Sequence, residues 1–251
     1  MNGTLYGIGV GPGDPELLTM KAHRLLKTAP VVAYPAPDSG ESFARSIVAD
    51  YMPGGQIEIP IVVPMRVERF PAKSVYDQAA ASIAEHLDSG SDVVVLCEGD
   101  PFFYGSFMYL FERLSASHHC EVVPGVSSLM ASGAMMGRPL AARNDVLTVV
   151  PGPCEDAIIS RALENSDALA FIKVGRHLPR LKNLIERAGL MEQATYLERV
   201  TLENQRIMPL SKVGTAGEPT APYFSMILIY RGAEDWISSL PMEQPGEEFN
   251  Q

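Results

Sequence analysis

Two apolar runs in the first half of the chain end in the same kind of turn. Val93–Cys97 leads into Glu98-Gly99-Asp100-Pro101, and the run that ends at Val10 leads into Gly11-Pro12-Gly13-Asp14-Pro15. A helical pattern follows each turn. Turns of Gly, Asp and Pro at the carboxyl end of a buried strand allow backbone groups, rather than side chains, to meet a ligand. The two turns predict a small-molecule site at the edge of a parallel sheet.

Strand-like and helix-like segments alternate through this half of the chain. The expected strands cover residues 4–10, 31–34, 57–59, 92–97 and 121–123. The expected helices cover residues 17–26, 42–51, 74–87 and 107–115. Alternation of this kind is typical of the α/β class, in which helices cover both faces of a doubly wound parallel sheet.

After Pro124-Gly125 the pattern begins again. The expected helices cover residues 126–136, 155–163 and 178–188, and the expected strands cover residues 146–150, 168–172, 195–198 and 224–230. Because fewer helices separate the last strands, we expect a mixed sheet. The sequence therefore predicts one α/β domain at residues 1–123 and a second at 124–240. The polar tail at 241–251 is expected to be disordered.

The composition excludes several classes of partner. The net charge is −10, whereas phosphate binding calls for a basic face, so no nucleic acid is expected. No apolar run approaches the ~18 residues of a membrane helix, and no signal peptide is evident. The three cysteines and the histidines show no metal-ligand spacing. We expect a cytoplasmic protein that binds neither a membrane nor a metal.

Residues 60–74 form a basic segment of little periodicity, which contains Arg66, Arg69 and Lys73. Two interpretations stay open. The segment is either a solvated connection or a lid that brings positive charge over an anionic substrate. The negative net charge does not exclude such a substrate, but it requires basic side chains to gather around one site.

The glycines near the amino terminus do not match a dinucleotide-binding fingerprint. Gly7, Gly9 and Gly11 are spaced as Gly-x-Gly-x-Gly. Tyr34 and Pro35 occupy the place where a ribose-binding acid would follow the second strand. A nicotinamide-dependent oxidoreductase is therefore disfavoured.

Several motifs in the right order carry a resemblance that spans residues 3–232. Tyr6–Thr19, Glu98–Gly105 and Val122–Ser128 resemble the tetrapyrrole methylases, the S-adenosylmethionine-dependent family of the cobalamin and sirohaem pathways. Further features are similar to the branch that methylates precorrin-2 at carbon 20. They are Lys173–Leu178, Pro222–Ser225, the basic insertion before Tyr76 and the run 139–145.

The resemblance implies a fold and a cofactor. We expect two α/β domains with S-adenosyl-L-methionine in the cleft between them, S-adenosyl-L-homocysteine as product, and a homodimer. The residues that fall at the cofactor-binding positions are Pro12, Glu98, Gly99, Asp100, Phe103, Ser127, Ser128, Val174, Val200, Phe224 and Ser225. Glu98 and Val200 stand where many relatives have glycine.

The implied reaction transfers a methyl group to carbon 20 of an electron-rich tetrapyrrole, so in-line positioning in a dry cleft is the main requirement. Carbon 20 must then lose a proton. Asp100, Tyr104 and Tyr223 are the catalytic candidates, and Glu98 is a further acceptor. Asp100 could instead cap its turn, and the two tyrosines could be walls of the cleft.

The substrate is a polycarboxylate, which arginine binds in two-pronged fashion. The candidates for this role are Arg66, Arg138, Arg143, Lys173 and Arg176, with Arg69, His177 and Arg199 as further ones. Arg138 and Arg143 rank highest because they flank the turn at Pro139-Leu140. Two other functions stay open. One is methylation of cobalt-precorrin-2 at the same carbon, and the other is a non-catalytic tetrapyrrole carrier.

Overall fold

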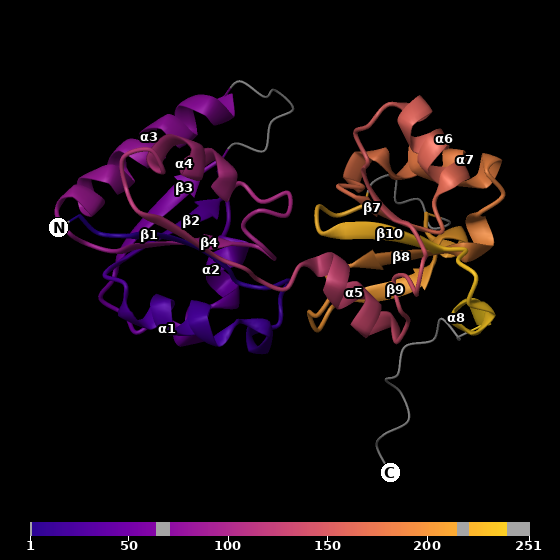
Figure 1. Ribbon diagram of the computed structural model, residues 1–251, viewed down its shortest axis with the longest axis horizontal. Coiled ribbons are helices and arrows are strands. Elements are labelled where there is room, and N and C mark those ends of the chain that lie inside the picture. Colours follow the sequence, from indigo (N-terminus) through magenta and orange to yellow (C-terminus); the bar gives the residue numbers. More distant parts are fainter. Residues whose placement is uncertain (1, 64–70, 215–220, 240–251) are drawn as a thin grey trace, which may run out of the picture. The chain divides into compact units, whose positions relative to one another are not determined.

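The computed structural model describes residues 2–63, 71–214 and 221–239. The chain divides into two units, Met1–Ser128 and Leu129–Gln251 (Figure 1). Each unit contains one five-stranded sheet with helices, so the predicted α/β class is confirmed. Arg66 and Arg69 of the basic segment, and the tail at 241–251, lie outside the described residues.

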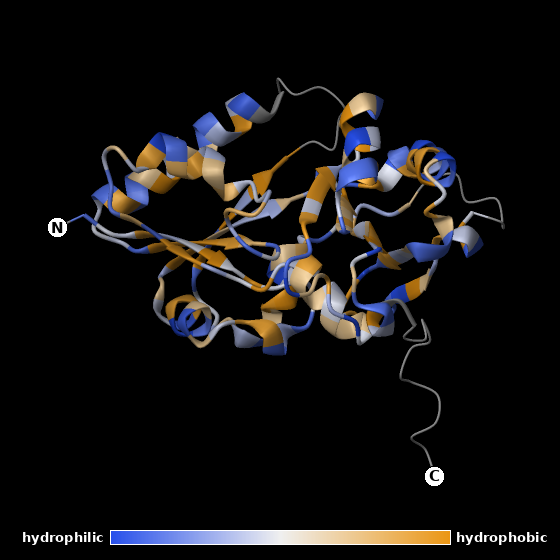
Figure 2. Cartoon of the chain, turned by 45° about the vertical axis from the view of Figure 1, so that its right-hand side comes forward, coloured by the Kyte–Doolittle hydropathy of each residue, from blue (hydrophilic) through white to orange (hydrophobic). Residues whose placement is uncertain are grey.

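The first unit is built on a parallel sheet in the order β3-β2-β4-β1-β5. Its strands are β1 (Leu5–Gly9), β2 (Val31–Ala36), β3 (Ile57–Val62), β4 (Val93–Cys97) and β5 (Cys120–Val123). Every residue of β4 is buried, because a parallel sheet that is covered on both sides needs apolar side chains on both of its faces. Figure 2 shows these strands mostly in the colour of hydrophobic residues, between helices that carry both colours.

Helices cover both faces of this sheet. α1 (Met20–Thr28) and α2 (Phe43–Ile47) pack on one face, and α3 (Pro71–Asp88) and α4 (Phe107–Leu114) pack on the other (Figure 1). β1 therefore leads to one face, and its neighbour β4 leads to the opposite face. Where neighbouring strands diverge in this way, α/β sheets bind ligands beyond the carboxyl ends of those strands.

Polar side chains fix where the first helix begins. Asp14 caps the short 3₁₀ helix Pro15–Leu17 through its carboxylate. Thr19 Oγ1 accepts the N–H of Ala22 at 3.2 Å and caps α1. Because Thr19 supplies the first capping group of the α-helix, the helix expected from residue 17 begins at Met20 instead.

The second unit is built on a mixed sheet in the order β6-β7-β10-β8-β9. Its strands are β6 (Leu147–Pro151), β7 (Ala168–Ile172), β8 (Ala194–Glu198), β9 (Arg206–Pro209) and β10 (Ser225–Tyr230). β6 and β7 are parallel, whereas β10 runs antiparallel to both of its neighbours and β9 runs antiparallel to β8. The carboxyl ends of β7 and β8 therefore lie at the same edge as the amino end of β10.

The helices of the second unit also lie on two faces (Figure 1). α5 (Ser128–Met136) packs on one face, where Ser132 Oγ donates to Met226 Sδ at 2.9 Å. α6 (Asp156–Asn165) and α7 (Leu178–Arg187) pack on the other. α8 (Asp235–Ser239) follows β10. None of the helices in the described ranges is long and apolar enough to cross a bilayer.

Candidate functional site

Three glycines, one at the end of a strand and two in loops, pack against one another at the carboxyl edge of the first sheet. Gly9 ends β1, Gly99 follows β4 and Gly125 follows β5, and these strands are neighbours. A Cβ atom on Gly125 would lie 2.7 Å from the Cα of Gly9, and closer still to the carbonyl oxygen of Gly99. Since any side chain would collide here, only glycine permits this approach. We call these three residues the glycine cradle.

Backbone hydrogen bonds join the loop after β1 to the loop after β4. The N–H of Gly99 donates to the carbonyl of Gly11 at 2.8 Å, and the N–H of Gly11 donates to the carbonyl of Gly99 at 3.4 Å. Gly11 and Gly99 have φ values of +81° and +64°, a left-handed conformation that glycine adopts without steric cost. The two turns that the sequence singled out therefore meet in the folded unit.

Asp100 joins the loop after β5 to the loop after β4. Its Oδ1 accepts the N–H groups of Phe102 at 2.9 Å and Phe103 at 3.0 Å, which caps the turn. Its Oδ2 accepts the N–H of Gly125 at 3.0 Å. Both carboxylate oxygens are thus engaged by backbone donors, as the capping interpretation of Asp100 expects.

Aromatic side chains follow Asp100 in the loop between β4 and α4. Phe102, Phe103 and Tyr104 are 49%, 38% and 44% exposed. Tyr104 has φ +57°, a conformation that costs a residue with a Cβ atom roughly 1–2 kcal/mol. Strain of this kind concentrates at functional sites. The loop therefore presents an apolar surface and a strained tyrosine at the carboxyl edge of the sheet.

The remaining candidates of the first unit lie in the same loops. Pro12 is buried in the loop after β1, and Ser127 is half-buried in the loop after β5. The Cα of Ser127 would lie 3.4 Å from a Cβ atom on Gly99. Ser128 is exposed at the start of α5. The structure therefore brings most of the expected cofactor residues of this unit to one sheet edge.

Glu98 directly follows β4 and is half-buried. Burial raises the pKa of the Glu98 carboxyl. Burial also raises the pKa of the neighbouring Cys97 thiol, and the charges of Glu98 and Asp100 raise it further. A carboxyl with a raised pKa is a stronger base than an ordinary one. Asp100, by contrast, is committed to backbone N–H groups.

The candidates of the second unit gather at one edge of its sheet. Val174 is fully buried in the loop after β7, and Val200 is 5% exposed in the loop after β8. The N–H of Arg199 donates to the carbonyl of Phe224 at 2.9 Å, which joins the loop after β8 to the start of β10. Ser225 Oγ donates to the carbonyl of Pro222 at 2.7 Å.

The same edge carries basic and strained residues. Lys173, Arg199 and Thr201 have φ values of +55°, +52° and +72°, which are unusual for residues with a Cβ atom. Lys173 and Arg176 are exposed in the loop after β7. Burial lowers the pKa of His177, and the positive charges of Arg180 and Arg176 lower it further. Tyr223 is 63% exposed and meets Phe224 edge to face, with ring centroids 5.0 Å apart.

One cluster at this edge was not predicted from the sequence. The buried carboxylate of Glu198, the last residue of β8, is bonded to Tyr196, Arg199 and Arg206. Arg206 lies opposite Glu198 across the β8–β9 pair. The signal in the sequence is an acid in an apolar strand, which requires charged or polar partners.

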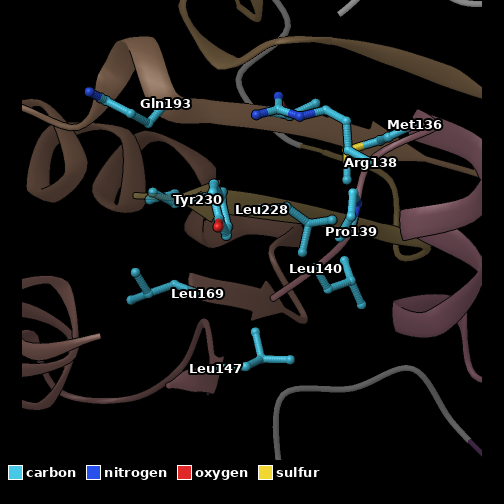
Figure 3. Close-up of a pocket in the computed structure, with 11 residues that line it drawn as sticks. Met136, Arg138, Pro139, Leu140, Leu147, Leu169, Gln193, Leu228 and Tyr230 are labelled. Carbon is cyan, nitrogen blue, oxygen red and sulfur yellow. The ribbon is translucent and has the colours of Figure 1, made fainter. Parts of the chain in front are cut away.

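Arg138 and Arg143 lie at the opposite edge of the second sheet. Arg138 lines a pocket with the start of β6 and the end of β10, where Leu228 and Tyr230 also lie (Figure 3). Burial lowers the pKa of Arg138. Arg143 Nε pairs with Glu234 Oε1 at 2.8 Å. The structure therefore does not bring these two arginines together with Lys173 and Arg176, and their role in binding substrate stays a prediction.

The chain matches the model of the family described as Tetrapyrrole (Corrin/Porphyrin) Methylases over residues 4–215. Precorrin-2 C(20)-methyltransferase of Sinorhizobium sp is 37% identical over 90% of this chain and 95% of its own length. Cobalt-precorrin-2 C(20)-methyltransferase of Salmonella typhimurium is 33% identical over 91% of this chain and 97% of its own length.

A third relative is longer than this chain. Cobalamin biosynthesis protein CobIJ of Mycobacterium tuberculosis is 39% identical over 92% of this chain, and the chain spans 46% of its length. The chain therefore spans about half the length of the mycobacterial relatives that it matches.

Solved structures share the fold. Uroporphyrin-III C-methyl transferase from Thermus thermophilus, complexed with S-adenyl homocysteine, matches with a TM-score of 0.65 and 25% identity. That match covers 91% of this chain and 97% of the other. Cobalt precorrin-4 methyltransferase matches with a TM-score of 0.69 and 23% identity over 94% of this chain and 96% of the other, a likeness of fold alone.

Proposed function

Because this chain belongs to the tetrapyrrole (corrin/porphyrin) methylase family, we propose that it methylates precorrin-2 at carbon 20, which gives precorrin-3A in cobalamin biosynthesis. The observation that carries the proposal is the 37% identity to the Sinorhizobium precorrin-2 C(20)-methyltransferase over nearly the full length of both chains.

We infer that the glycine cradle belongs to the binding site for S-adenosyl-L-methionine. Gly9, Gly99 and Gly125 carry no side chains and pack against one another, so the loops at this sheet edge meet through peptide groups. That surface fits a ligand gripped by backbone groups. Pro12, Phe103 and Ser127 lie in the same loops, and Ser128 follows Ser127. For the second unit, contacts from Val174, Val200, Phe224 and Ser225 stay predictions.

S-Adenosylmethionine supplies an electrophilic methyl group on a positively charged sulfur. The chain's own task is positioning and the exclusion of water, which lowers the barrier without a strong acid or metal-activated group. The exposed rings of Phe103 and Tyr104 supply apolar surface for that purpose. The left-handed backbone conformation of Tyr104 determines the direction in which its side chain leaves the main chain.

We infer that Glu98 accepts the proton that carbon 20 loses. Its carboxyl has a pKa raised by burial, which moves it toward neutral pH, where a general base is most effective. Asp100 uses both oxygens on backbone donors. We therefore rank Glu98, which the sequence analysis gave only as a further proton acceptor, ahead of Asp100, Tyr104 and Tyr223.

A second candidate function is methylation of cobalt-precorrin-2 at the same carbon. The Salmonella relative bears that name and is 33% identical over 97% of its length. The distinction depends on the metal state of the substrate. Parallel reactions with metal-free and cobalt-loaded precorrin-2 separate the two functions by their kcat/KM ratio.

The test of the proposed function uses the full chain, ¹³C-methyl-labelled S-adenosylmethionine and precorrin-2. We expect a product with one added methyl group, whose ¹³C resonance assigns it to carbon 20. A methyl group on a pyrrole carbon or on oxygen would contradict the regiochemistry. Binding of precorrin-2 without any methyl transfer would support the tetrapyrrole carrier instead.

Two further expectations come from the family resemblance. We propose that the protein is a homodimer and acts in the cytoplasm. Size-exclusion chromatography with light scattering of the full chain tests the dimer, and a mass equal to one chain at micromolar concentration would contradict it.

A further inference from the structure

A buried carboxylate holds two arginines at the carboxyl end of β8. Glu198 Oε1 accepts from Arg199 Nη1 at 2.9 Å and from Arg206 Nη1 at 3.3 Å. Glu198 Oε2 accepts the hydroxyl of Tyr196 at 2.6 Å. Burial and the hydrogen bond to Glu198 both raise the pKa of Tyr196, so its hydroxyl stays a donor at any physiological pH.

The exposure of these groups is uneven. The side chain of Glu198 is 3% exposed, whereas those of Arg199 and Arg206 are 38% and 46% exposed. Because one carboxylate is shared by two guanidinium groups, the cluster carries a net positive charge. An anion that approaches this edge therefore meets the guanidinium groups, while the compensating acid lies beneath them.

Arg199 is bonded through both its backbone and its guanidinium. Its backbone has φ +52°, and its N–H is bonded to the carbonyl of Phe224. Within the described part of the chain, its guanidinium meets Glu198 through Nη1, which leaves other N–H donors of the fork for a ligand. Lys173 and Arg176 follow β7 at the same edge of the sheet, and Glu203 follows Arg199 in the loop after β8.

We propose that Glu198 is a positioning residue that fixes Arg199 for recognition of a carboxylate of the substrate. The proposal rests on the proposed function for the identity of that substrate, an anionic tetrapyrrole. A fixed guanidinium loses less conformational freedom when it pairs with a carboxylate, so it binds more tightly and with defined geometry. Tyr196 helps to fix the carboxylate because its hydroxyl donates to the second oxygen of Glu198.

The first test replaces the arginine. We expect Arg199→Gln to raise the KM for precorrin-2 about tenfold, the cost of a charge-assisted hydrogen bond, with little change in kcat. Arg187→Gln is the matched control, because Arg187 is an exposed arginine in the last turn of α7, and it should leave KM unchanged. An unchanged KM in Arg199→Gln would overturn the proposal.

The second test separates positioning from stability. Glu198→Gln keeps the shape of the side chain but removes the charge that both arginines share, and we expect KM to rise about three- to tenfold. In the Arg199→Gln background the same change should alter KM less than about twofold, because Glu198 acts through Arg199. Equal effects in both backgrounds would show a merely structural role and overturn the proposal.

Two measurements guard against a folding defect. Calorimetry with S-adenosylhomocysteine should give the same affinity for each variant as for the natural chain. Tyr196→Phe, which removes only the hydroxyl, should raise KM about two- to threefold with the same dependence on Arg199. If the KM of Tyr196→Phe does not change while its stability falls, the cluster is structural and the proposal fails.

A non-reacting probe distinguishes this proposal from the proposed function. Uroporphyrin III is a tetrapyrrole polycarboxylate whose binding can be followed by its absorbance. If the natural chain fails to methylate precorrin-2 but binds uroporphyrin III, and Arg199→Gln weakens that binding about tenfold, the arginine site stands while the methylation assignment fails. Equal binding by both chains overturns the arginine site.

Discussion

We predict that one carbon atom added to the glycine cradle disables the candidate site of the first unit. In Gly125→Ala the new Cβ would lie 2.7 Å from Gly9 Cα and nearer still to the carbonyl oxygen of Gly99. Gly125 itself does not have a positive φ, so the backbone conformation adds no strain. The collision can be relieved only if the loops after β1, β4 and β5 move apart.

The size of that movement sets the expected effect. Ordinary contacts begin near 3.4 Å, so the loops must separate by roughly 1 Å, a displacement that lowers a rate about 100-fold when it misplaces a reacting group. Overpacking of this kind also costs about 1–3 kcal/mol of folding free energy, which lowers Tm by about 2–4 °C for each kcal/mol.

The assay compares two alanine variants by kcat/KM for methyl transfer and by calorimetry with S-adenosylhomocysteine. Gly54→Ala is the control, since Gly54 has φ +81° and no atom within 4 Å of its added Cβ. A left-handed alanine costs roughly 1–2 kcal/mol, so the control loses comparable stability without disturbing the cradle. Equal cofactor affinity in Gly125→Ala and the natural chain would show that the cradle does not take part in cofactor binding.

Three further predictions concern ionisable groups. The pKa of Glu98 is raised by burial, so the native state binds this proton more tightly than the unfolded chain, and ionisation opposes folding at neutral pH. Glu98→Gln should therefore raise Tm at pH 7 while it lowers kcat, and the gain in Tm should vanish below about pH 4; a loss of Tm at pH 7 would contradict this. Asp100→Asn should keep the turn but place an amide N–H against the N–H of Gly125, which costs about 1–3 kcal/mol in urea unfolding; unchanged stability would show that the bond to Gly125 is unimportant. The N–H of Ala142 and the hydroxyl of Tyr230 lower the pKa of Asp145, so its contribution to stability is present at neutral pH and is lost as pH falls through that lowered pKa. Asp145→Asn should thus be less stable than the natural chain at pH 7 and nearly equal to it near pH 2, as measured by thermal melts; a difference that persists at low pH would contradict this assignment.

The central strands of both sheets could be predicted because uninterrupted apolar runs in the sequence indicate that they are buried. Val93–Cys97 is apolar throughout, a pattern that is typical of a strand covered on both faces of a parallel sheet. In the structure every residue of β4 is buried. The expected helix at 42–51 was less accurate. It divides into α2 and the short 3₁₀ helix Ala49–Tyr51, because Val48 leaves the helical conformation with φ −105° and ψ 9°.

β9 and α8 were missed for a physical reason. β9 is an edge strand of four residues that begins with Arg206 and ends with Pro209, and it is stabilised by pairing with β8 rather than by its own pattern. α8 is five residues long, too short for helical periodicity to be recognised. Elements of this size depend on partners that lie elsewhere in the chain.

The turns at the carboxyl edge of the first sheet could be predicted because local sequence determines them. Gly11 and Gly99 were expected in backbone-rich turns because Gly and Pro dictate turns directly. The bond between Asp100 and Gly125 joins residues 25 positions apart, and the pairing of Glu198 with Arg206 depends on strand register. Neither can be read from a local pattern. For the same reason the sequence could not show that Arg138 lies at the other edge of the second sheet.

A crystal structure of the full chain with S-adenosylhomocysteine would show directly where the cofactor binds. We predict that the ligand lies at the carboxyl edge of β4, β1 and β5, in contact with backbone groups of the loops that contain Gly11, Gly99 and Gly125. Density for the ligand in the pocket beside Arg138 and Tyr230, or at any place that leaves those three loops untouched, would contradict it.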